Sequence, residues 1–303
     1  MKITFFIISF SITLFCFGQN KSQTYEENLL DKAYTIENVL GYTSLNILIK
    51  EKDSIKSNFA KETKRQILSN AEEYYDKLID SFPNSKLIYK AIIGKAYIKY
   101  EIGEYQNAKK EFLKIYNTRD SLNFSSNNSE MSARFWVAIH LAEIAVMDKE
   151  YNAALVYLES SKNYTIRYMC LNGYYQDQAK YKYLMAKSYI GLNDYEKAYS
   201  ILIPNLFEPG CLSDAGIIEL AIESLQKKHS KSELKSLYEK AFKNYQVEID
   251  ESRKKPITRF YILFLNEKIY LPYYEDKNTD KKDRQESIDK VLAKSKFYQK
   301  LNS

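Results

Sequence analysis

The chain has 303 residues, of which 45% are hydrophobic and 28% charged, and its formal net charge is +6. Its 28 tyrosines and 15 phenylalanines exclude a disordered chain, while only 8 glycines and 5 prolines argue against sandwiches and barrels and favour long helices. The net charge does not indicate nucleic-acid binding, because Lys and Glu alternate along the chain and form no basic stripe.

Residues 1–18 have the plan of a secretory signal peptide, with Lys2 followed by a nearly uncharged apolar run that ends at Phe17. This run is too short to cross a hydrocarbon core of about 30 Å at about 1.5 Å per residue. We expect cleavage between Gly18 and Gln19, and export of a mature chain without a transmembrane segment to the periplasm or cell surface. A lipid anchor at Cys16 is disfavoured, because Phe15 stands where a lipoprotein signal has a small residue.

The rest of the chain divides into three predicted parts. Residues 19–58 are an N-terminal helical segment that opens with a polar lead, 59–245 are helical repeats, and 246–303 are a capping segment and tail. In the middle part, apolar residues recur at i, i+3, i+4 and i+7, which is typical of amphipathic helices.

A pattern of small residues repeats within these helices. Three units share two alanines 12 positions apart, a tyrosine three places before the second alanine, and a large apolar residue four places after it. The units are Ala96, Tyr105, Ala108 and Phe112; Ala142, Tyr151, Ala154 and Leu158; and Ala186, Tyr195, Ala198 and Leu202. Small residues at the middle of two helices let them pack closely as a hairpin, so we predict three antiparallel hairpins.

The pattern resembles the tetratricopeptide repeat from about residue 50 to residue 245. An earlier half-unit, Ala71, Tyr75 and Pro83, matches the family's second helix and its closing proline. The stretch 82–105 is most similar to repeats of exported bacterial cell-envelope proteins. The resemblance implies an all-α solenoid of stacked antiparallel helical hairpins.

The period departs from that family. Its usual repeat has 34 residues, whereas Tyr105 and Tyr151 lie 151 − 105 = 46 apart, and Tyr151 and Tyr195 lie 195 − 151 = 44 apart. The extra residues must lengthen the helices or the connections. By composition, residues 117–129 are predicted as one such loop.

The C-terminal part contains the densest apolar stretch of the mature chain, residues 255–272. Pro256 would suit the first position of a helix, but the Ile, Tyr and Phe content equally allows a β-hairpin that turns near Asn266 and Glu267. In either form we expect it to cap the last hairpin. We also expect a charged linker at 275–283 and a short amphipathic helix at 287–301.

Cys170 and Cys211 fall between successive hairpins, on the same edge of the predicted solenoid. An exported protein permits a disulfide. Successive helices pack about 8–10 Å apart, whereas a disulfide needs Cα atoms within about 7 Å, so the two cysteines would pair only if their loops lean together. The alternative is two unpaired, packed cysteines.

No catalytic, metal or cofactor motif is found. His140 lies in an apolar helix and reads as a packed side chain, while His229 follows two lysines at a helix end. Acidic pairs such as Glu72 and Glu73 are common in a chain this charged, so we expect no enzyme activity, no metal and no cofactor.

Surface recognition is therefore the expected function. The first helices of stacked hairpins line a concave face, whose polar and aromatic positions are candidate binding residues. They are Tyr97, Lys99, Tyr100, Arg134, Tyr181, Lys182, Tyr183 and Tyr189. We expect a scaffold for a protein or peptide, of which an immunity-type protein is one form. A carbohydrate-binding component of a nutrient-uptake system and an enzyme site within the C-terminal part are the alternatives.

Overall fold

A computed structural model describes residues 24–41, 49, 54–117, 123–126, 129–162, 171–207, 216–251, 257–273 and 281–303. In these residues the chain is mostly helical, as the sequence predicts, with twelve α-helices. It also holds a three-stranded antiparallel sheet near the C-terminus, where a β-hairpin was one of the expected alternatives, and a two-stranded antiparallel sheet that the all-α class did not include. The chain forms two compact units, Met1–Ile98 and Lys99–Ser303. None of the helices in the described ranges is both long and apolar enough to cross a bilayer.

The first unit begins with α1 (Tyr25–Gly41), which packs against α3 (Ser54–Ser81). A reciprocal capping box starts α1: the Glu27 amide donates to Thr24 Oγ1 at 3.2 Å, and the Thr24 amide donates to Glu27 Oε2 at 2.9 Å. The sequence predicts a boundary after residue 58 between the N-terminal helical segment and the helical repeats. Because α3 is continuous across residue 58, this boundary falls inside a helix.

The half-unit predicted from Ala71, Tyr75 and Pro83 lies on α3 and just after it. Ala71 and Tyr75 are fully buried, and Pro83 is exposed. The Tyr75 hydroxyl donates to Glu37 Oε1 of α1 at 3.0 Å. Tyr75 also lies against Gly94 of the next helix, α4 (Ile88–Glu101), which holds the buried Ala96.

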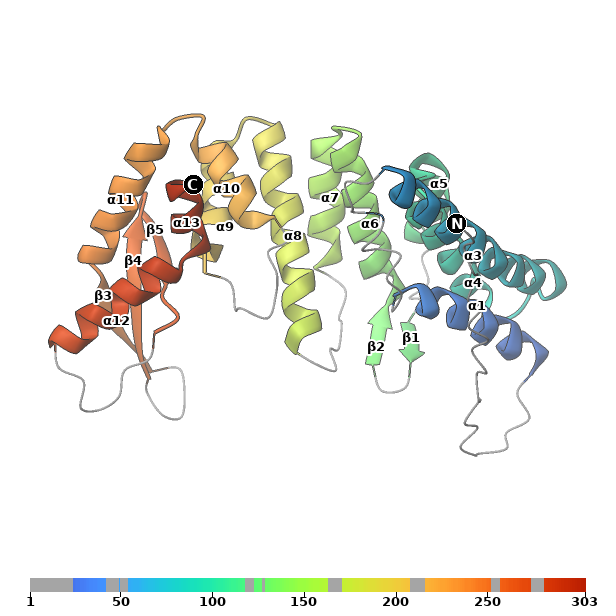
Figure 1. Ribbon diagram of the computed structural model, residues 1–303. Helices are drawn as coiled ribbons and strands as arrows, with labels where there is room; N and C mark the ends of the chain where they lie inside the picture. Colours follow the sequence, from blue (N-terminus) through green and yellow to red (C-terminus); the bar gives the residue numbers. More distant parts are fainter. Residues whose placement is uncertain are drawn as a thin grey trace, which may run out of the picture. The chain divides into compact units, whose positions relative to one another are not determined.

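The second unit continues with helices joined in chain order. They are α5 (Tyr105–Tyr116), α6 (Ala133–Met147), α7 (Tyr151–Ser161), α8 (Leu171–Gly191), α9 (Tyr195–Leu202), the short 3-10 helix η1 (Ile203–Asn205), α10 (Ile217–Leu225) and α11 (Lys231–Lys243). Each helix from α5 to α9 packs against the next one, and α10 contacts both α8 and α9 (Figure 1). The second alanine of each predicted pair is buried, as are Ala142, Ala186, Phe112, Leu158 and Leu202.

The turns before α5, α7 and α9 have the same backbone geometry. Gly103, Lys149 and Asn193 have positive φ angles of 86°, 62° and 61°. In each turn the next amide bonds back to a carbonyl five residues earlier: Glu104 to Lys99 at 2.8 Å, Glu150 to Ala145 at 2.7 Å, and Asp194 to Tyr189 at 2.9 Å. This is the Schellman motif that closes a helix through a left-handed residue.

The turn tyrosines differ in burial. Tyr105 is 39% exposed, whereas Tyr151 and Tyr195 are half-buried. The ring of Tyr151 lies so close to Gly191 of α8 that a Cβ there would meet it at 2.3 Å. Tyr151 therefore fills the space that a glycine leaves on the following hairpin.

The predicted loop at 117–129 is wrong in part. β1 (Asn123–Ser126) and β2 (Ser129–Ser132) form an antiparallel hairpin between α5 and α6, with Asn123 opposite Ser132. Four-residue strands of polar composition give little β signal, because pairing and not side-chain pattern stabilises them.

Near the C-terminus a sheet with the order β3-β4-β5 forms from β3 (Gln246–Asp250), β4 (Ile257–Phe264) and β5 (Glu267–Tyr270). The hairpin alternative is thus confirmed for this stretch. Its turn residues, Leu265 and Asn266, have φ angles of 51° and 67°, which suits a two-residue type I′ turn one position before the expected one.

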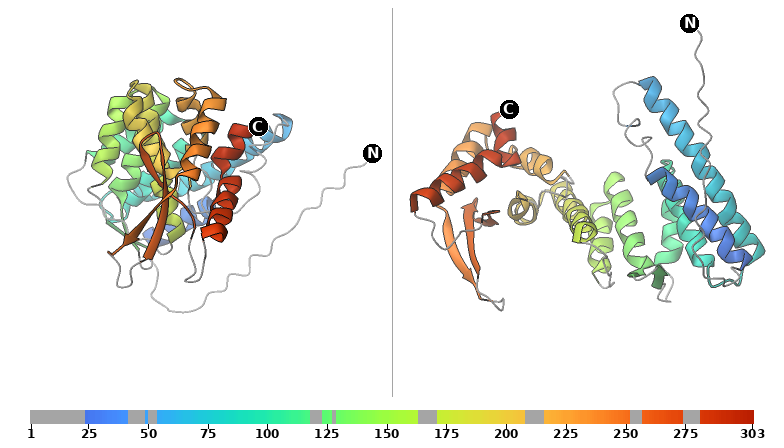
Figure 2. Two further views of the ribbon diagram at one scale, coloured as in Figure 1. Left: turned by 90° about the vertical axis from the view of Figure 1, so that its left-hand side faces the viewer. Right: turned by 60° about the horizontal axis from the view of Figure 1, so that its bottom comes forward.

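Two further helices close the unit, α12 (Lys281–Lys294) and α13 (Lys296–Asn302) (Figure 2). The single helix expected at 287–301 is interrupted at Ser295, whose Oγ accepts the Tyr298 amide at 3.3 Å and caps α13. α12 begins inside the expected linker. The ring of Tyr238, on α11, packs at 5.0 Å from both Phe264 and Phe297, so helices and sheet share one core.

Several predictions fall outside the described residues. These are the signal peptide with its cleavage site, Cys16, the pairing of Cys170 with Cys211, and Pro256.

Candidate binding surface

All the predicted binding residues except Tyr97 lie in the second unit. Lys99 and Tyr100 end α4, Arg134 is on α6, and Tyr181, Lys182, Tyr183 and Tyr189 are on α8. Tyr97 belongs to the first unit and is 37% exposed. The Tyr100 ring contacts His140 of α6, and α6 packs against α8.

Tyr100, His140, Glu143 and Lys180 form a polar cluster in the second unit. Lys180 Nζ lies 2.7 Å from Glu143 Oε2, which joins α8 to α6 by an ion pair. His140 Nδ1 lies 3.7 Å from the same oxygen, which is too long for an ordinary hydrogen bond. The His140 ring stacks on Phe112 with centroids 5.3 Å apart, and the Tyr100 ring lies 4.8 Å away on a tilted plane.

Burial and neighbouring groups shift the pKa values of three residues in this cluster. Burial alone would raise the pKa of Glu143, but His140, Lys180 and Tyr100 stabilise the carboxylate and lower its pKa to about 2. Burial lowers the pKa of His140, and burial together with Glu143 raises the pKa of Tyr100. At neutral pH the cluster therefore holds the Glu143 carboxylate, a neutral imidazole and a neutral phenol.

Three lysines near these tyrosines make polar or cation–π contacts with neighbouring side chains. Lys182 Nζ donates to Asn205 Oδ1 at 2.6 Å. Lys187 donates to the Tyr183 hydroxyl at 3.1 Å and lies 5.3 Å from the centre of that ring. Lys197 of α9 lies 5.4 Å from the centre of the Tyr189 ring.

The tyrosines are half-buried. Tyr181 and Tyr183 pack at the edge of the core that α6, α7 and α8 share, and Tyr183 also lies against Gly216. These side chains therefore combine packing with partial exposure. Arg134 is half-buried on α6.

Sequence reasoning missed the ion pair of Glu143 with Lys180. It placed His140 correctly as a packed side chain, since the rings of Phe112 and Tyr100 lie against it. Glu143 and Lys180 lie on different helices and are 37 positions apart in the sequence (180 − 143 = 37), so no local spacing connects them. The alternation of charges along each helix gave no signal that this pair meets.

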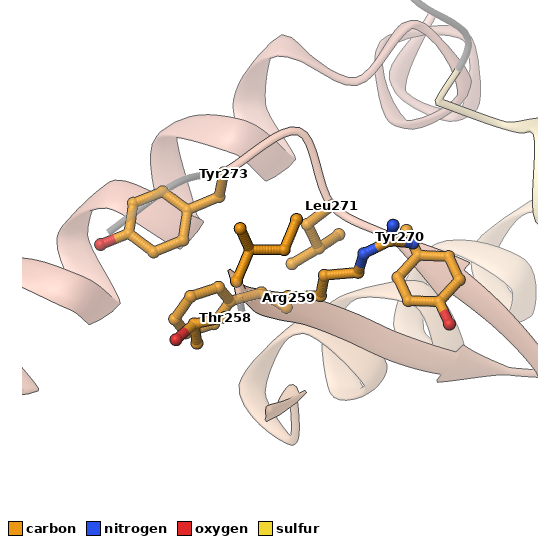
Figure 3. A pocket seen from close by; sticks show the side chains of 7 residues that line it. Thr258, Arg259, Tyr270, Leu271 and Tyr273 are labelled. Atoms are coloured by element: carbon orange, nitrogen blue, oxygen red, sulfur yellow. The ribbon is translucent and has the colours of Figure 1, made fainter. Parts of the chain in front are cut away.

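A small cavity lies in the C-terminal sheet. A cavity of about 190 Å³ is lined by residues of β4, β5 and the segment after β5. Figure 3 shows the side chains of Arg259 and Tyr270 on one side of Leu271. Tyr273 lies on the opposite side of Leu271. The Arg259 guanidinium lies 5.3 Å from the Tyr270 ring centre and is ion-paired with Asp250 at 2.5 Å. Small-molecule sites usually enclose about 300–1,000 Å³, so this cavity is small for one.

Within the described residues, no group of three or more His, Cys, Asp or Glu side chains is arranged to hold a metal ion. No protein-family model, curated protein or solved structure matches the chain.

Proposed function

We propose that the chain is an exported, non-catalytic helical-repeat protein of the tetratricopeptide type, which binds a protein or an extended peptide. The observation that carries the proposal is the identical turn geometry at Gly103, Lys149 and Asn193, each followed two residues later by a tyrosine. Repeated hairpins of this kind present their first helices on one continuous surface. Within the second unit, α6 and α8 are such helices.

The chemistry of the polar cluster favours recognition over catalysis. A general acid or base works best with a pKa near the operating pH. Glu143, with a pKa of about 2, stays ionised, and burial lowers the pKa of His140 and so keeps its ring neutral at pH 7. Fixed charges and half-buried tyrosines offer a partner directional contacts at little entropic cost.

The test is capture of a partner from an envelope fraction with crosslinking, using the wild type and three variants. We expect Lys180→Gln and Tyr189→Ala to lose the captured protein. Lys114→Gln is the matched control, because Lys114 is an exposed α5 lysine paired with Glu111 of its own helix. Failure to capture a partner, or equal capture by all variants, would contradict the proposal.

Carbohydrate binding is the less supported alternative. Stacking on a sugar needs a free ring face, whereas Lys187 and Lys197 lie over the rings of Tyr183 and Tyr189. A glycan-array signal that disappears in Tyr189→Ala would favour that function instead.

A further inference from the structure

The two edges of the C-terminal sheet differ in how they are covered. η1 packs against β5 at one edge. At the other edge, β3 pairs with β4 alone among the described strands, through five residue pairs from Gln246–Tyr261 to Asp250–Ile257. The outward side of β3 is thus a candidate site for another strand.

β3 lacks the features that usually protect an edge strand. It contains no proline, glycine or lysine, and its pairing with β4 has no bulge. Val247 is 47% exposed and Ile249 is 64% exposed. Both lie on the same face of the sheet as the buried Phe260, because Val247 is opposite Phe260.

The acidic residues of β3 are neutralised within the sheet. Glu248 Oε2 accepts from Lys268 at 2.7 Å, and Glu248 Oε1 accepts from the Tyr270 hydroxyl at 2.6 Å. Asp250 pairs with Arg259. Charge repulsion, which would otherwise keep a second strand away, is therefore weakened at this edge.

We propose that β3 pairs antiparallel with β3 of a second copy of this chain, with Val247 on the two-fold axis. In that register Tyr245 of one copy is opposite Ile249 of the other, and Gln246 is opposite Glu248. The apolar residues then share one face and the polar residues the other, since alternate residues of a strand point to opposite faces. The two sheets join into one continuous sheet.

The Gln246 side chain has a hydrogen-bond donor available for this pairing. Its Oε1 accepts the Tyr261 hydroxyl at 2.5 Å, and in the described part of the chain its amide nitrogen has no acceptor. That nitrogen is a donor for the facing carboxylate of Glu248. An alternative pairing with Glu248 on the two-fold axis is less favourable, because it places the Glu248 carboxylates of the two copies directly opposite each other.

The inference goes beyond the proposed function and does not depend on it. A pair of five-residue strands is smaller than the usual stable interface of about 1,600 Å². We therefore expect a reversible dimer in which the backbone hydrogen bonds are supported by few side-chain contacts.

The first test measures the dimer dissociation constant of the full chain by sedimentation equilibrium. We expect Val247→Lys to weaken dimerisation at least tenfold. Leu263→Lys is the matched control, because Leu263 is 45% exposed but lies on the central strand β4. A wild-type chain that stays monomeric, or equal weakening by both variants, would overturn the proposal.

The second test addresses the register and uses substitutions that change little in volume. Gln246→Glu places two carboxylates opposite each other across the axis, so we expect weaker dimerisation. Combining it with Glu248→Gln restores a carboxylate–amide pair, and we expect the dimer to recover. A double variant no stronger than Gln246→Glu alone would overturn this register.

Discussion

Left-handed backbone positions are the residue-scale feature that the three hairpin turns share. A non-glycine residue with positive φ costs about 1 kcal/mol relative to glycine. Lys149 is such a residue and is exposed. We predict that Lys149→Gly raises the free energy of unfolding by about 1 kcal/mol, as measured by denaturant titration.

Two controls accompany this prediction. Lys149→Ala removes the side chain without relaxing the backbone, so we expect no gain. Gly103→Ala forces a Cβ into the left-handed region, so we expect a loss of about 1 kcal/mol. A stabilising Gly103→Ala would show that the turn geometry is not the cause.

Acid sensitivity is the second residue-scale prediction. Glu143 has a folded pKa of about 2 against an ordinary value of 4.5, so its contribution is complete above about pH 5 and is lost as the pH falls towards 2. We predict that Glu143→Gln destabilises the chain at pH 7 by up to about 3 kcal/mol, and that this difference shrinks in acid.

The measurement is the free energy of unfolding of wild type and variant at several pH values between 7 and 2.5. Glu159→Gln is the control, because Glu159 is exposed and forms a local ion pair with Lys162 at the end of α7. A pH-independent difference for Glu143→Gln would contradict the assigned pKa.

Residues that follow a local period were predictable, and those that meet across helices were not. The alanine pairs could be found because each lies at a fixed spacing on helices joined by a short turn. The ion pair of Glu143 with Lys180 depends on how α6 and α8 pack. No spacing in the sequence encodes that packing.

At the scale of elements, a tyrosine fitted against a glycine joins successive helices in two places. A Cβ on Gly94 would meet the Tyr75 ring at 2.3 Å, and a Cβ on Gly191 would meet the Tyr151 ring at 2.3 Å. Tyr75 is fully buried and bonded to Glu37, whereas Tyr151 is half-buried. The two rings therefore differ in their freedom to move.

We predict that Gly94→Ala destabilises the chain by about 2 kcal/mol or more, although alanine favours helix by about 1 kcal/mol. Gly191→Ala should cost less, because Tyr151 has room to move towards solvent. Thermal unfolding of both variants checks the order. A larger loss in Gly191→Ala would contradict it.

The helices and strands themselves were only partly predictable from the sequence. The C-terminal hairpin was one of two open alternatives. The β1–β2 hairpin was missed because its polar residues resemble a loop. The long repeat period has a structural basis in this hairpin between α5 and α6, and in the 21 residues of α8.

At the scale of the whole molecule, the C-terminal helices complete the core of the second unit. Phe297 of α13 is fully buried and contacts both Tyr238 and Phe264. Replacing a buried phenylalanine by alanine costs about 3–5 kcal/mol. We predict that Phe297→Ala lowers hydrogen-exchange protection in α10, α11 and β4.

The same experiment tests the repeat architecture. If hairpins interact only with their neighbours, protection in α6 and α7 should remain close to that of the wild type. Uniform loss throughout the second unit would indicate a single cooperative domain. The sequence predicted a mostly helical chain but gave no means to establish how far each hairpin depends on the next.

Trp136 is the sole tryptophan of the chain. It lies on α6, half-buried, with its ring edge-on to Phe135 at 5.5 Å. Its fluorescence consequently reports the melting of one hairpin, whereas far-ultraviolet circular dichroism averages over every helix. Superimposable transitions from the two signals would mean that the chain unfolds in one step, and separated midpoints would reveal partly melted intermediates without any added label.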